Sequence, residues 1–328
     1  MRYTLFAVLF AGILLWNSCS VAPEPVNPNA SFEARELLAR LYEIQGEMIF
    51  SGQHNYPHQL TRSSDTVFSY TGRYPVVWGC DLRDAQDFIT NGMEEAIRQH
   101  NKGAIVTAMS HMDRPFDTIG TRRSSWREIS DEQWADLITP GTELHGMLIE
   151  RIDNIAGMLK ILDDANVPVL WRPFHEMNGI WFWWGNRPGP GGFEELWKIM
   201  YYRYTDHHRL NNLIWVWNPN APRDWEDDEA YAYELFFPGH QYVDVLAADV
   251  YQNDYRQSHH DDLLELANGK PIGLGEVGVL PTPEILEQQP MWTWFMCWAN
   301  WIWTHNTPEQ VRELYDSPRV VTLGDIEP

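Results

Sequence analysis

The sequence predicts an α/β protein built as a single (β/α)8 TIM barrel. Eight short apolar runs recur along the chain, and helical patterns separate several of them. Each run is hydrophobic almost throughout, without alternating polar residues, which is typical of strands buried on both faces of a parallel sheet. Strands that alternate with helices favour a barrel, and 328 residues are enough for one such domain.

Each apolar run ends in polar residues or glycine, as strands of a barrel do where they meet its loops. The runs cover residues 47–54, 75–82, 104–111, 167–176, 213–219, 243–251, 271–278 and 293–301. Apolar side chains recur every three or four positions over 145–166, which predicts a long helix, and 193–208 and 261–268 show similar patterns. Residues 114–130 lack such a pattern. An irregular stretch of this length on a barrel is expected to belong to its functional face.

The first eighteen residues are typical of an export signal. One early arginine precedes an apolar run that is too short to cross a bilayer, and Cys19 follows a small residue, as at the lipidation site of bacterial lipoproteins. Residues 19–30 are rich in proline and predict a tether that does not pack, so the folded domain is expected at 31–328. We expect an exported protein, lipid-anchored to the bacterial outer membrane through Cys19. Plain secretion is the alternative, and the sequence does not give the membrane face.

Charge and cysteine content narrow the classes of partner. The formal net charge is −22, from 24 basic and 46 acidic residues, which repels phosphate backbones and makes nucleic acid an unsuitable partner. Beyond Cys19, Cys80 and Cys297 are too few for a disulfide scaffold, and two buried free thiols are favoured over one bridge. A monomer is the default expectation.

Tryptophan is unusually frequent, with 17 residues in the chain. A buried indole needs a hydrogen-bond partner for its N–H group, so we expect about half of these residues in the core and the rest on stacking surfaces. The stretch "WRPFHEMNGIWFWWG" (171–185) places four tryptophans beside a His-Glu pair. This pattern indicates a platform for a flat, uncharged ligand with a carboxyl group at its edge.

Polar side chains at the ends of the apolar runs predict one site, because the carboxyl ends of barrel strands carry the chemistry in this fold. Six runs end in such a group: His54, Asp81, His111, Glu176, Tyr251 and Glu276. Glu176 closes the fourth run and Glu276 the seventh, so both should project into one mouth from opposite sides of the ring. Two facing carboxyls are the minimum apparatus for cleaving a glycosidic bond, one protonated and one ionised.

The neighbours of the two glutamates suggest which one is the general acid and which one is the nucleophile. The aromatic surroundings of Glu176 should raise the pKa of its carboxyl, which suits a general acid. Arg172 and Tyr251 should hold Glu276 ionised, as a nucleophile requires. The glycines of "GLGEVG" (273–278) are expected to let backbone and substrate approach closely.

Other chemistries lack their motifs. His175-Glu176 has no second histidine four residues on, because position 179 is glycine, so the zinc-protease helix is absent. There is no G-x-S-x-G serine elbow and no phosphate-binding G-x-x-x-x-G-K loop. A grouping of aspartates around Asp81 is better explained by ion pairs or contacts to hydroxyl groups than by a cation. We expect neither a metal ion nor an organic cofactor.

Several motifs together resemble glycoside hydrolase family 26, most of whose members are endo-β-1,4-mannanases. "RPFHEMNGIWFWWG" resembles the family's acid/base motif and "GLGEVG" its nucleophile strand, while "TAMSH", "ITPGTELHGML" and "DVYQND" fall in the expected order. The resemblance runs from about residue 31 to 318. It implies a (β/α)8 barrel and retaining, double-displacement hydrolysis without a cofactor, with Glu176 as acid/base and Glu276 as nucleophile.

The resemblance also implies contacts to substrate. His175 would contact the sugar at the cleavage point, and Trp298 would form the floor of the −1 subsite. Five further residues are candidates for substrate binding: His111, Arg172, Trp181, Tyr251 and Trp126, the last of them in the long irregular loop.

The expected activity is endo-hydrolysis of β-1,4-mannosidic bonds in mannan, glucomannan or galactomannan. Within the same fold and mechanism, the alternatives are a β-1,3-xylanase, a mixed-linkage β-glucanase and an exo-acting mannobiohydrolase. Outside enzymes, the alternative is a sugar-binding lipoprotein, which would need the aromatic residues but not both glutamates.

Overall fold

The computed structural model describes residues 23–82, 86–121 and 123–326. The predicted signal peptide at 1–18, the lipidation candidate Cys19 and the first part of the proposed tether lie outside the described residues. Within the described ranges, no helix combines the length and the apolar character needed to span a bilayer.

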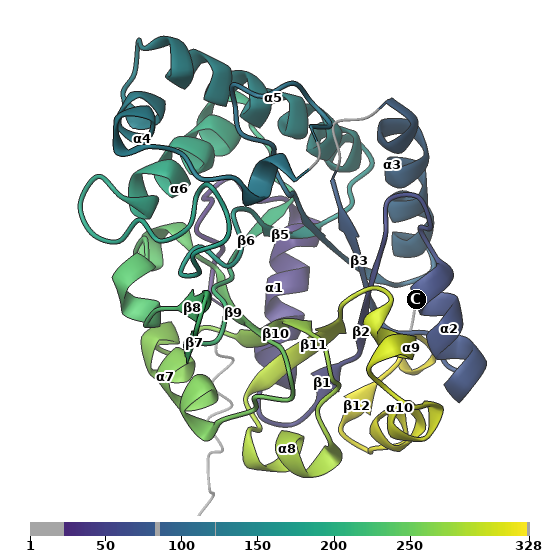
Figure 1. The fold of residues 1–328 in the computed structure, drawn as a ribbon. Coiled ribbons are helices and arrows are strands. Elements are labelled where there is room, and N and C mark those ends of the chain that lie inside the picture. The colour runs from purple at the N-terminus through teal and green to yellow at the C-terminus, as the bar shows by residue number, and fades with distance from the viewer. Residues whose placement is uncertain (1–22, 83–85, 122, 327–328) are drawn as a thin grey trace, which may run out of the picture.

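Eight parallel strands close into a barrel, which confirms the predicted fold class (Figure 1). The strands are β2 (Gly52–Asn55), β3 (Val77–Asp81), β4 (Ile105–Met109), β5 (Val169–Arg172), β6 (Leu213–Trp217), β9 (Val245–Val250), β10 (Ile272–Val277) and β11 (Trp292–Cys297). Strand β2 pairs with β3 on one side and with β11 on the other, which closes the ring. Every predicted apolar run overlaps one barrel strand. Two short strands, β1 (Ile49–Phe50) and β12 (Val320–Val321), extend the sheet beside β11.

Helices surround the barrel: α1 (Phe32–Ile44), α2 (Arg62–Thr71), α3 (Gln86–His100), α4 (Asp131–Ile138), α5 (Glu143–Asp164), α6 (Phe193–Tyr202), α7 (Gln257–Ala267), α8 (Pro283–Gln288), α9 (Trp301–Thr304) and α10 (Pro308–Tyr315). The predicted helix at 145–166 is α5, which Thr142 caps by accepting the His145 amide N–H. The prediction at 261–268 lies mostly in α7. The prediction at 193–208 covers α6 and a following π-helical turn, η2 (Arg203–His207).

The remaining elements lie in the connections. They are the short helices η1 (Ser124–Trp126), η3 (Tyr233–Phe236), η4 (His240–Tyr242) and η5 (Leu323–Asp325), and a hairpin of β7 (Arg223–Trp225) and β8 (Asp228–Ala230). In the described part of the predicted irregular stretch at 114–130, the structure has one regular element, η1, because α4 begins at Asp131 after the Ser130 cap.

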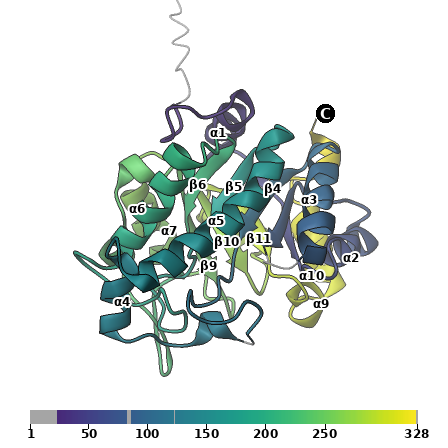
Figure 2. The same ribbon diagram turned by 90° about the horizontal axis from the view of Figure 1, so that it is seen from above.

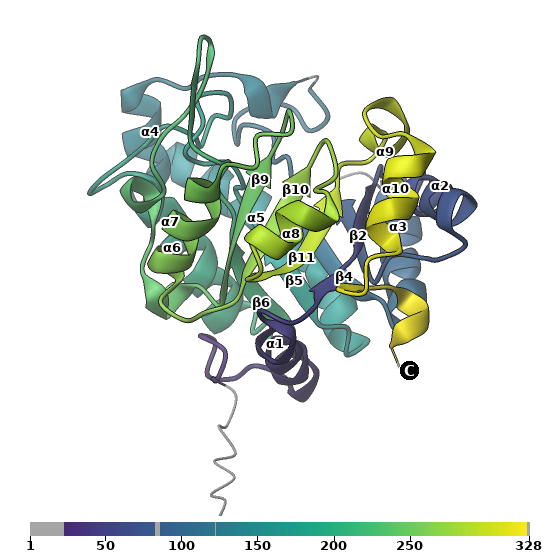
Figure 3. The ribbon, with the colours of Figure 1, turned by 90° about the horizontal axis from the view of Figure 1, so that it is seen from below.

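Apolar side chains form two layers, and the position of the first layer shows which end of the barrel is closed. One layer joins inward-facing strand residues, such as Leu170 and Val245, to Leu37 and Leu41 of α1. The other packs the outer faces of the strands against the surrounding helices. Figures 2 and 3 show α1 across one end of the barrel, with α4 and α9 at the opposite end. The carboxyl ends of the strands therefore open on the side away from α1.

The folded domain begins before residue 31, which corrects the predicted boundary of the tether. The Val26 amide donates to Asp244 Oδ1 at 2.7 Å, and the Tyr201 hydroxyl donates to the Val26 carbonyl at 2.8 Å. Asn27 is fully buried and donates to the Leu210 carbonyl at 3.2 Å. Proline-rich composition did not prevent packing here, because these partners satisfy the polar groups of the segment.

The core contains roughly the share of tryptophans that the sequence suggested. Ten of those in the described ranges are buried: Trp78, Trp134, Trp171, Trp183, Trp184, Trp197, Trp215, Trp217, Trp292 and Trp294. The stretch 171–185 therefore builds core for the most part, and among its four indoles only that of Trp181 is partly exposed. Cys80 and Cys297 are buried and free, as predicted.

Candidate active site

Glu176 lies in a turn beyond its strand, four residues after β5 ends at Arg172. The sequence placed it at the end of the strand itself, and the structure corrects this. Phe174 and Glu176 both adopt positive φ angles, of 49° and 55°. Such backbone is unfavourable for residues with a Cβ and persists only where surrounding contacts fix it. Here the Glu176 amide donates to the Asn218 carbonyl at 2.7 Å, which ties the turn to the end of β6.

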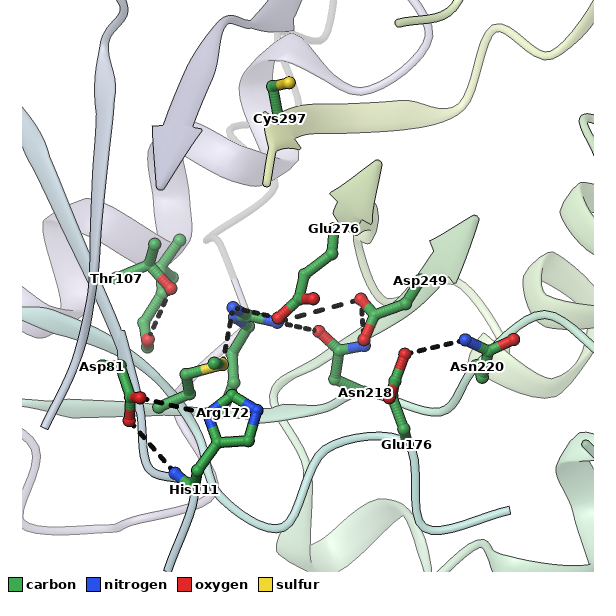
Figure 4. Close-up of polar contacts among 12 residues, drawn as sticks. Asp81, Thr107, His111, Arg172, Glu176, Asn218, Asn220, Asp249, Glu276 and Cys297 are labelled. Carbon is green, nitrogen blue, oxygen red and sulfur yellow. Dashed lines mark hydrogen bonds and ion pairs between the residues drawn. The ribbon is translucent and has the colours of Figure 1, made fainter. Parts of the chain in front are cut away.

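The two predicted carboxyls meet in one site. Glu276 lies on β10, and its side chain points toward that of Glu176 (Figure 4). One oxygen each of Glu176, Glu276 and Asp249 lie within 4.8 Å of one another. Glu176 is 7% exposed and Glu276 is 2% exposed, so both carboxyls are largely shielded from bulk water.

Glu176 has surroundings that favour its protonated form near neutral pH. Burial first, and then the charge of Glu276, raise the pKa of Glu176 to about 7. Two donors oppose this shift: Trp181 Nε1 donates to Oε2 at 2.7 Å, and Asn220 Nδ2 donates to Oε1 at 2.8 Å. A carboxyl with a pKa near neutral is suited to give and take a proton in the same cycle.

Glu276 is held by the two groups that the sequence assigned to it. Arg172 Nη2 donates to Oε1 at 3.2 Å, and the Tyr251 hydroxyl donates to Oε2 at 2.7 Å. Arg172 is 1% exposed, so its charge acts with little solvent screening. Both groups donate to the carboxyl and hold it in one orientation, as the attack of a nucleophile requires.

Asp249 on β9 is a third buried carboxyl that the sequence analysis did not single out. Asn218 Nδ2 donates to its Oδ1 at 2.8 Å, and Arg172 Nη1 lies 3.8 Å from the same oxygen. Burial, followed by the charges of Glu276 and Glu176, raises the pKa of Asp249 well above its ordinary value. Asp249 lies two residues before Tyr251, which is just beyond the end of β9, and in extended backbone this spacing puts two side chains on the same side, which is the signal that could have found Asp249.

The three carboxyls are poorly suited to binding a metal ion. Asn220 and Trp181 occupy the oxygens of Glu176, Arg172 and Tyr251 occupy those of Glu276, and Asn218 occupies one oxygen of Asp249. Among the six oxygens of these three carboxyls, Asp249 Oδ2 is the one that is buried without a hydrogen-bond partner. A guanidinium beside the cluster repels a cation, and hard cations require several free oxygens.

Two histidines lie beside the carboxyl pair. His111 follows β4, and its Nδ1 lies 3.1 Å from Asp81 Oδ2 at the end of β3. Because the carboxylate accepts, Nδ1 carries the proton and Nε2 remains for another partner. The ring of His175 stands edge-on to that of His111 at 4.9 Å. Burial, and then the charge of His111, lower the pKa of His175 well below its ordinary value.

Two tryptophans that the sequence analysis proposed for substrate binding lie near the carboxyls and histidines. Trp298 follows β11 directly and stacks on His54 with ring centroids 4.2 Å apart. Trp126 in η1 is 53% exposed and meets Phe182 edge-on at 5.0 Å, next to the turn that carries Glu176. The structure therefore brings together all the predicted site residues in the described ranges.

The glycines of 273–278 allow neighbouring side chains to approach the backbone closely. A Cβ on Gly275 would lie 1.9 Å from Asn218 Oδ1 and 2.8 Å from Asp249 Oδ1. A Cβ on Gly278 would lie 2.3 Å from the Trp301 ring. These positions lack a side chain because polar and aromatic neighbours occupy the space.

Comparison with known proteins agrees with this geometry. The sequence model of glycosyl hydrolase family 26 matches residues 26–325. The chain belongs to this family. Among solved structures, the family 26 chain is similar to GH26A from a Muricauda species, with a TM-score of 0.89 and 48% identity, over 92% of this chain and 99% of that one.

Curated relatives carry the name mannan endo-1,4-beta-mannosidase. The protein from Thermothelomyces thermophilus is 34% identical over 92% of this chain, but the chain spans only 63% of its length. The protein from Bacillus subtilis strain 168 is 29% identical over 92% of this chain and 89% of its own length.

Proposed function

We propose that this family 26 barrel is a retaining endo-β-1,4-mannanase. The observation that carries the proposal is a pair of buried carboxyls, Glu176 and Glu276, with oxygens within 4.8 Å of each other. Their surroundings differ: burial and a neighbouring charge raise the pKa of Glu176, whereas an arginine and a tyrosine donate to Glu276. Retaining enzymes hold their carboxyls about 5–5.5 Å apart, whereas inverting enzymes need about 6.5–9.5 Å for a water molecule. The names of the curated relatives support mannan as the substrate.

In the first step, Glu276 attacks the anomeric carbon and Glu176 gives its proton to the leaving oxygen. The glycosidic C–O bond breaks and a glycosyl ester forms on Glu276. In the second step, ionised Glu176 takes a proton from water, the water oxygen attacks the same carbon, and the ester bond breaks. Arg172 and Tyr251 hold Glu276 for attack and stabilise it as the leaving group of the second step.

The surrounding side chains are assigned to the sugar. Pyranose rings present apolar C–H faces, which stack on indoles, and hydroxyl edges, which need polar partners. We assign Trp298 to the floor of the −1 subsite and His175 and His111 to sugar hydroxyls there. Trp181 and Trp126 are assigned to the walls of the cleft.

Reducing-sugar release from glucomannan, galactomannan, β-1,3-xylan and mixed-linkage glucan tests the substrate. We expect release from the mannans with oligosaccharides of several lengths, which is the pattern of endo action. Release from xylan or mixed-linkage glucan alone would contradict the substrate and leave the mechanism intact. Mannobiose as the sole product would indicate exo action, and binding without release would indicate a sugar-binding protein.

The activity should fall on the alkaline side as Glu176 loses its proton. The free enzyme needs protonated Glu176 for the first step, so the alkaline limb of kcat/KM reports its pKa. Because that pKa is raised to about 7, the limb should be centred near pH 7. A pH profile of kcat/KM on glucomannan measures this. A limb near pH 4.5, the ordinary range of an exposed glutamate, would contradict the assignment.

We also propose that the chain is exported and anchored by a lipid on Cys19, with secretion after plain cleavage as the alternative. The early arginine, the short apolar run and the small residue before Cys19 support this. Mass spectrometry of the mature N-terminus distinguishes a lipidated cysteine from a free one. Protease treatment of intact cells then determines the membrane face.

A further inference from the structure

Arg223 lies close to Glu176, although no motif in the sequence singles it out. It is the first residue of β7, in the hairpin between β6 and β9. Its side chain is only 8% exposed. Arginine is rarely this buried unless its N–H groups have acceptors, so its partners indicate what it does.

The guanidinium of Arg223 is fixed from two sides. Nε and Nη2 donate to the carbonyl and to Oδ1 of Asp228, at 2.9 and 2.7 Å, across the hairpin. The remaining amine, Nη1, donates to Asn220 Oδ1 at 2.7 Å. All three nitrogens therefore have an acceptor, and the planar fork is held in one orientation.

This contact decides which way the Asn220 amide points. Arg223 donates only, so the oxygen of the Asn220 amide must face it. The NH2 group of the amide then faces Glu176 and donates to Oε1 at 2.8 Å. Without Arg223, the amide oxygen loses this donor, and the amide can turn its oxygen toward Glu176 whenever the carboxyl is protonated and donates.

Arg223 also contacts the group that holds the other oxygen of Glu176. Its Cζ lies over the ring of Trp181 at 5.0 Å and over that of Trp225 at 4.8 Å. Guanidinium groups stack favourably on indoles. Trp181 Nε1 in turn donates to Glu176 Oε2 at 2.7 Å. Both oxygens of the carboxyl are thus bonded by groups that Arg223 touches.

The hairpin and the turn that carries Glu176 are joined directly. Gly179 and Ala230 form an antiparallel bridge, and Asn178 Nδ2 donates to the Tyr231 carbonyl at 2.7 Å. The Trp181 indole folds over Gly179, where a Cβ would lie 2.3 Å from the ring. Figure 1 shows β7 and β8 as a separate pair beside the barrel strands.

We propose that Arg223 is a positioning residue that holds Asn220 and Trp181 against the two oxygens of Glu176. The inference rests on the proposed function for the role of Glu176, and it deepens that function by naming what aligns the acid/base. Both donors favour the ionised carboxylate, so they oppose the effect of burial and of the neighbouring charges. Those charged or titratable neighbours are Glu276 on β10 and, at β9, Asp249 and Tyr251. A substitution in the hairpin leaves all three in place.

The test is the pH dependence of kcat/KM in hairpin variants. In Arg223→Ala, the alkaline limb should move up by roughly 0.5–1 pH unit, because the carboxyl loses a nearby charge and two oriented donors. We expect kcat on glucomannan to fall roughly tenfold with a smaller change in KM, since a misaligned base slows the second step. Arg223→Lys keeps the charge but cannot supply the fork, so its limb should also move, by a smaller amount.

Arg203 offers a matched control. Its guanidinium donates to both oxygens of Asp153 at 2.8 and 2.7 Å, between η2 and α5 on the outside of the barrel. Arg203→Ala therefore loses a paired arginine without touching the site, and its pH profile should match that of the unaltered enzyme. A purely structural role for Arg223 would lower the melting temperature and leave the alkaline limb where it was.

A double-mutant cycle tests the path through Asn220. If Arg223 acts through this amide, Arg223→Ala should shift the limb much less in an Asn220→Ala background. Equal shifts in both backgrounds, an unshifted Arg223→Ala, or an Arg223→Lys that matches the unaltered enzyme would each overturn the proposal. Should Arg223→Ala not fold, Arg223→Lys and its own cycle with Asn220→Ala decide the matter.

A titration that needs no substrate separates this inference from the proposed function. The carboxyl carbon of Glu176 is followed by 13C NMR and assigned with Glu176→Gln. An upward shift of its pKa in the Arg223 variants supports the positioning role even if the unaltered chain releases no sugar from mannan. No shift overturns the positioning role even if mannan is hydrolysed.

Discussion

Glu276→Ala is expected to lose hydrolysis of every glycan that the unaltered enzyme cleaves, by more than about 10⁴-fold in kcat. The reason is that the first step forms a glycosyl ester on this carboxylate, so without it the step has no nucleophile. Asp249 is the nearest candidate, but burial and two neighbouring charges raise its pKa well above its ordinary value, which disfavours the anion. Initial rates on glucomannan, with protein folding checked by circular dichroism, measure the loss.

Glu95 provides a matched control for Glu276. It is a buried glutamate, 5% exposed, on α3, where it accepts from Gln99 Nε2 at 2.6 Å. Glu95→Ala removes a comparable carboxylate far from the site and should keep near-normal kcat. If Glu276→Ala kept even a tenth of the rate, or if both variants lost the same fraction, the nucleophile would have to be sought elsewhere.

Azide sharpens the test, because it is a small nucleophile that fits the space of a missing carboxyl. With Glu276→Ala and an aryl β-glycoside that has a good leaving group, azide should attack the anomeric carbon from the side that Glu276 occupied. The aryl C–O bond breaks, the phenolate leaves, and the product is an α-glycosyl azide. In the same variant, the pKa of Glu176 should fall below its value of about 7, because the charge that helps to raise it is gone.

The barrel could be read from the sequence because its strands are buried on both faces. Such strands give short continuous apolar runs, and their length and the polar or glycine residues that follow them distinguish them from buried helices, so all eight were found. The boundaries were less exact for a physical reason. Glu176 sits on a turn with positive φ, held by an amide contact to Asn218 that no local pattern predicts.

The glutamate pair and two of its partners, Arg172 and Tyr251, could be predicted, whereas the contacts of Asp249, Asn220 and Arg223 could only be seen in the fold. Asp249 was hidden within an apolar run, and its role depends on β9 lying beside β10. Asn220 and Arg223 come from the connection after β6, and no pattern in that stretch of sequence indicates that they contact or lie near Glu176. The prediction of a ligand platform at 171–185 was wrong for a related reason: an indole in the core and one that faces a ligand look alike in a sequence, and only packing distinguishes them.

Glu176→Ala should separate the two steps of the reaction, because its loss affects them differently on different substrates. On glucomannan, kcat should fall roughly 10²–10⁴-fold, since the leaving sugar oxygen needs a proton. With a dinitrophenyl β-glycoside, the first step should be nearly unchanged, because the phenolate leaves without one. The second step still lacks its base, so stopped-flow absorbance should show a burst of phenolate followed by slow turnover.

Azide distinguishes this variant from the nucleophile variant by stereochemistry. In Glu176→Ala the glycosyl ester on Glu276 still forms, and azide, which needs no general base, attacks it in place of water. The ester bond breaks with a second inversion, so the product is a β-glycosyl azide and turnover accelerates. Glu176→Gln retains the shape of the side chain and should behave alike, which rules out a cavity as the cause. Equal losses on polymer and aryl substrates, or an α-azide from this variant, would mean that the two carboxyls have been assigned the wrong way round or act in some other reaction.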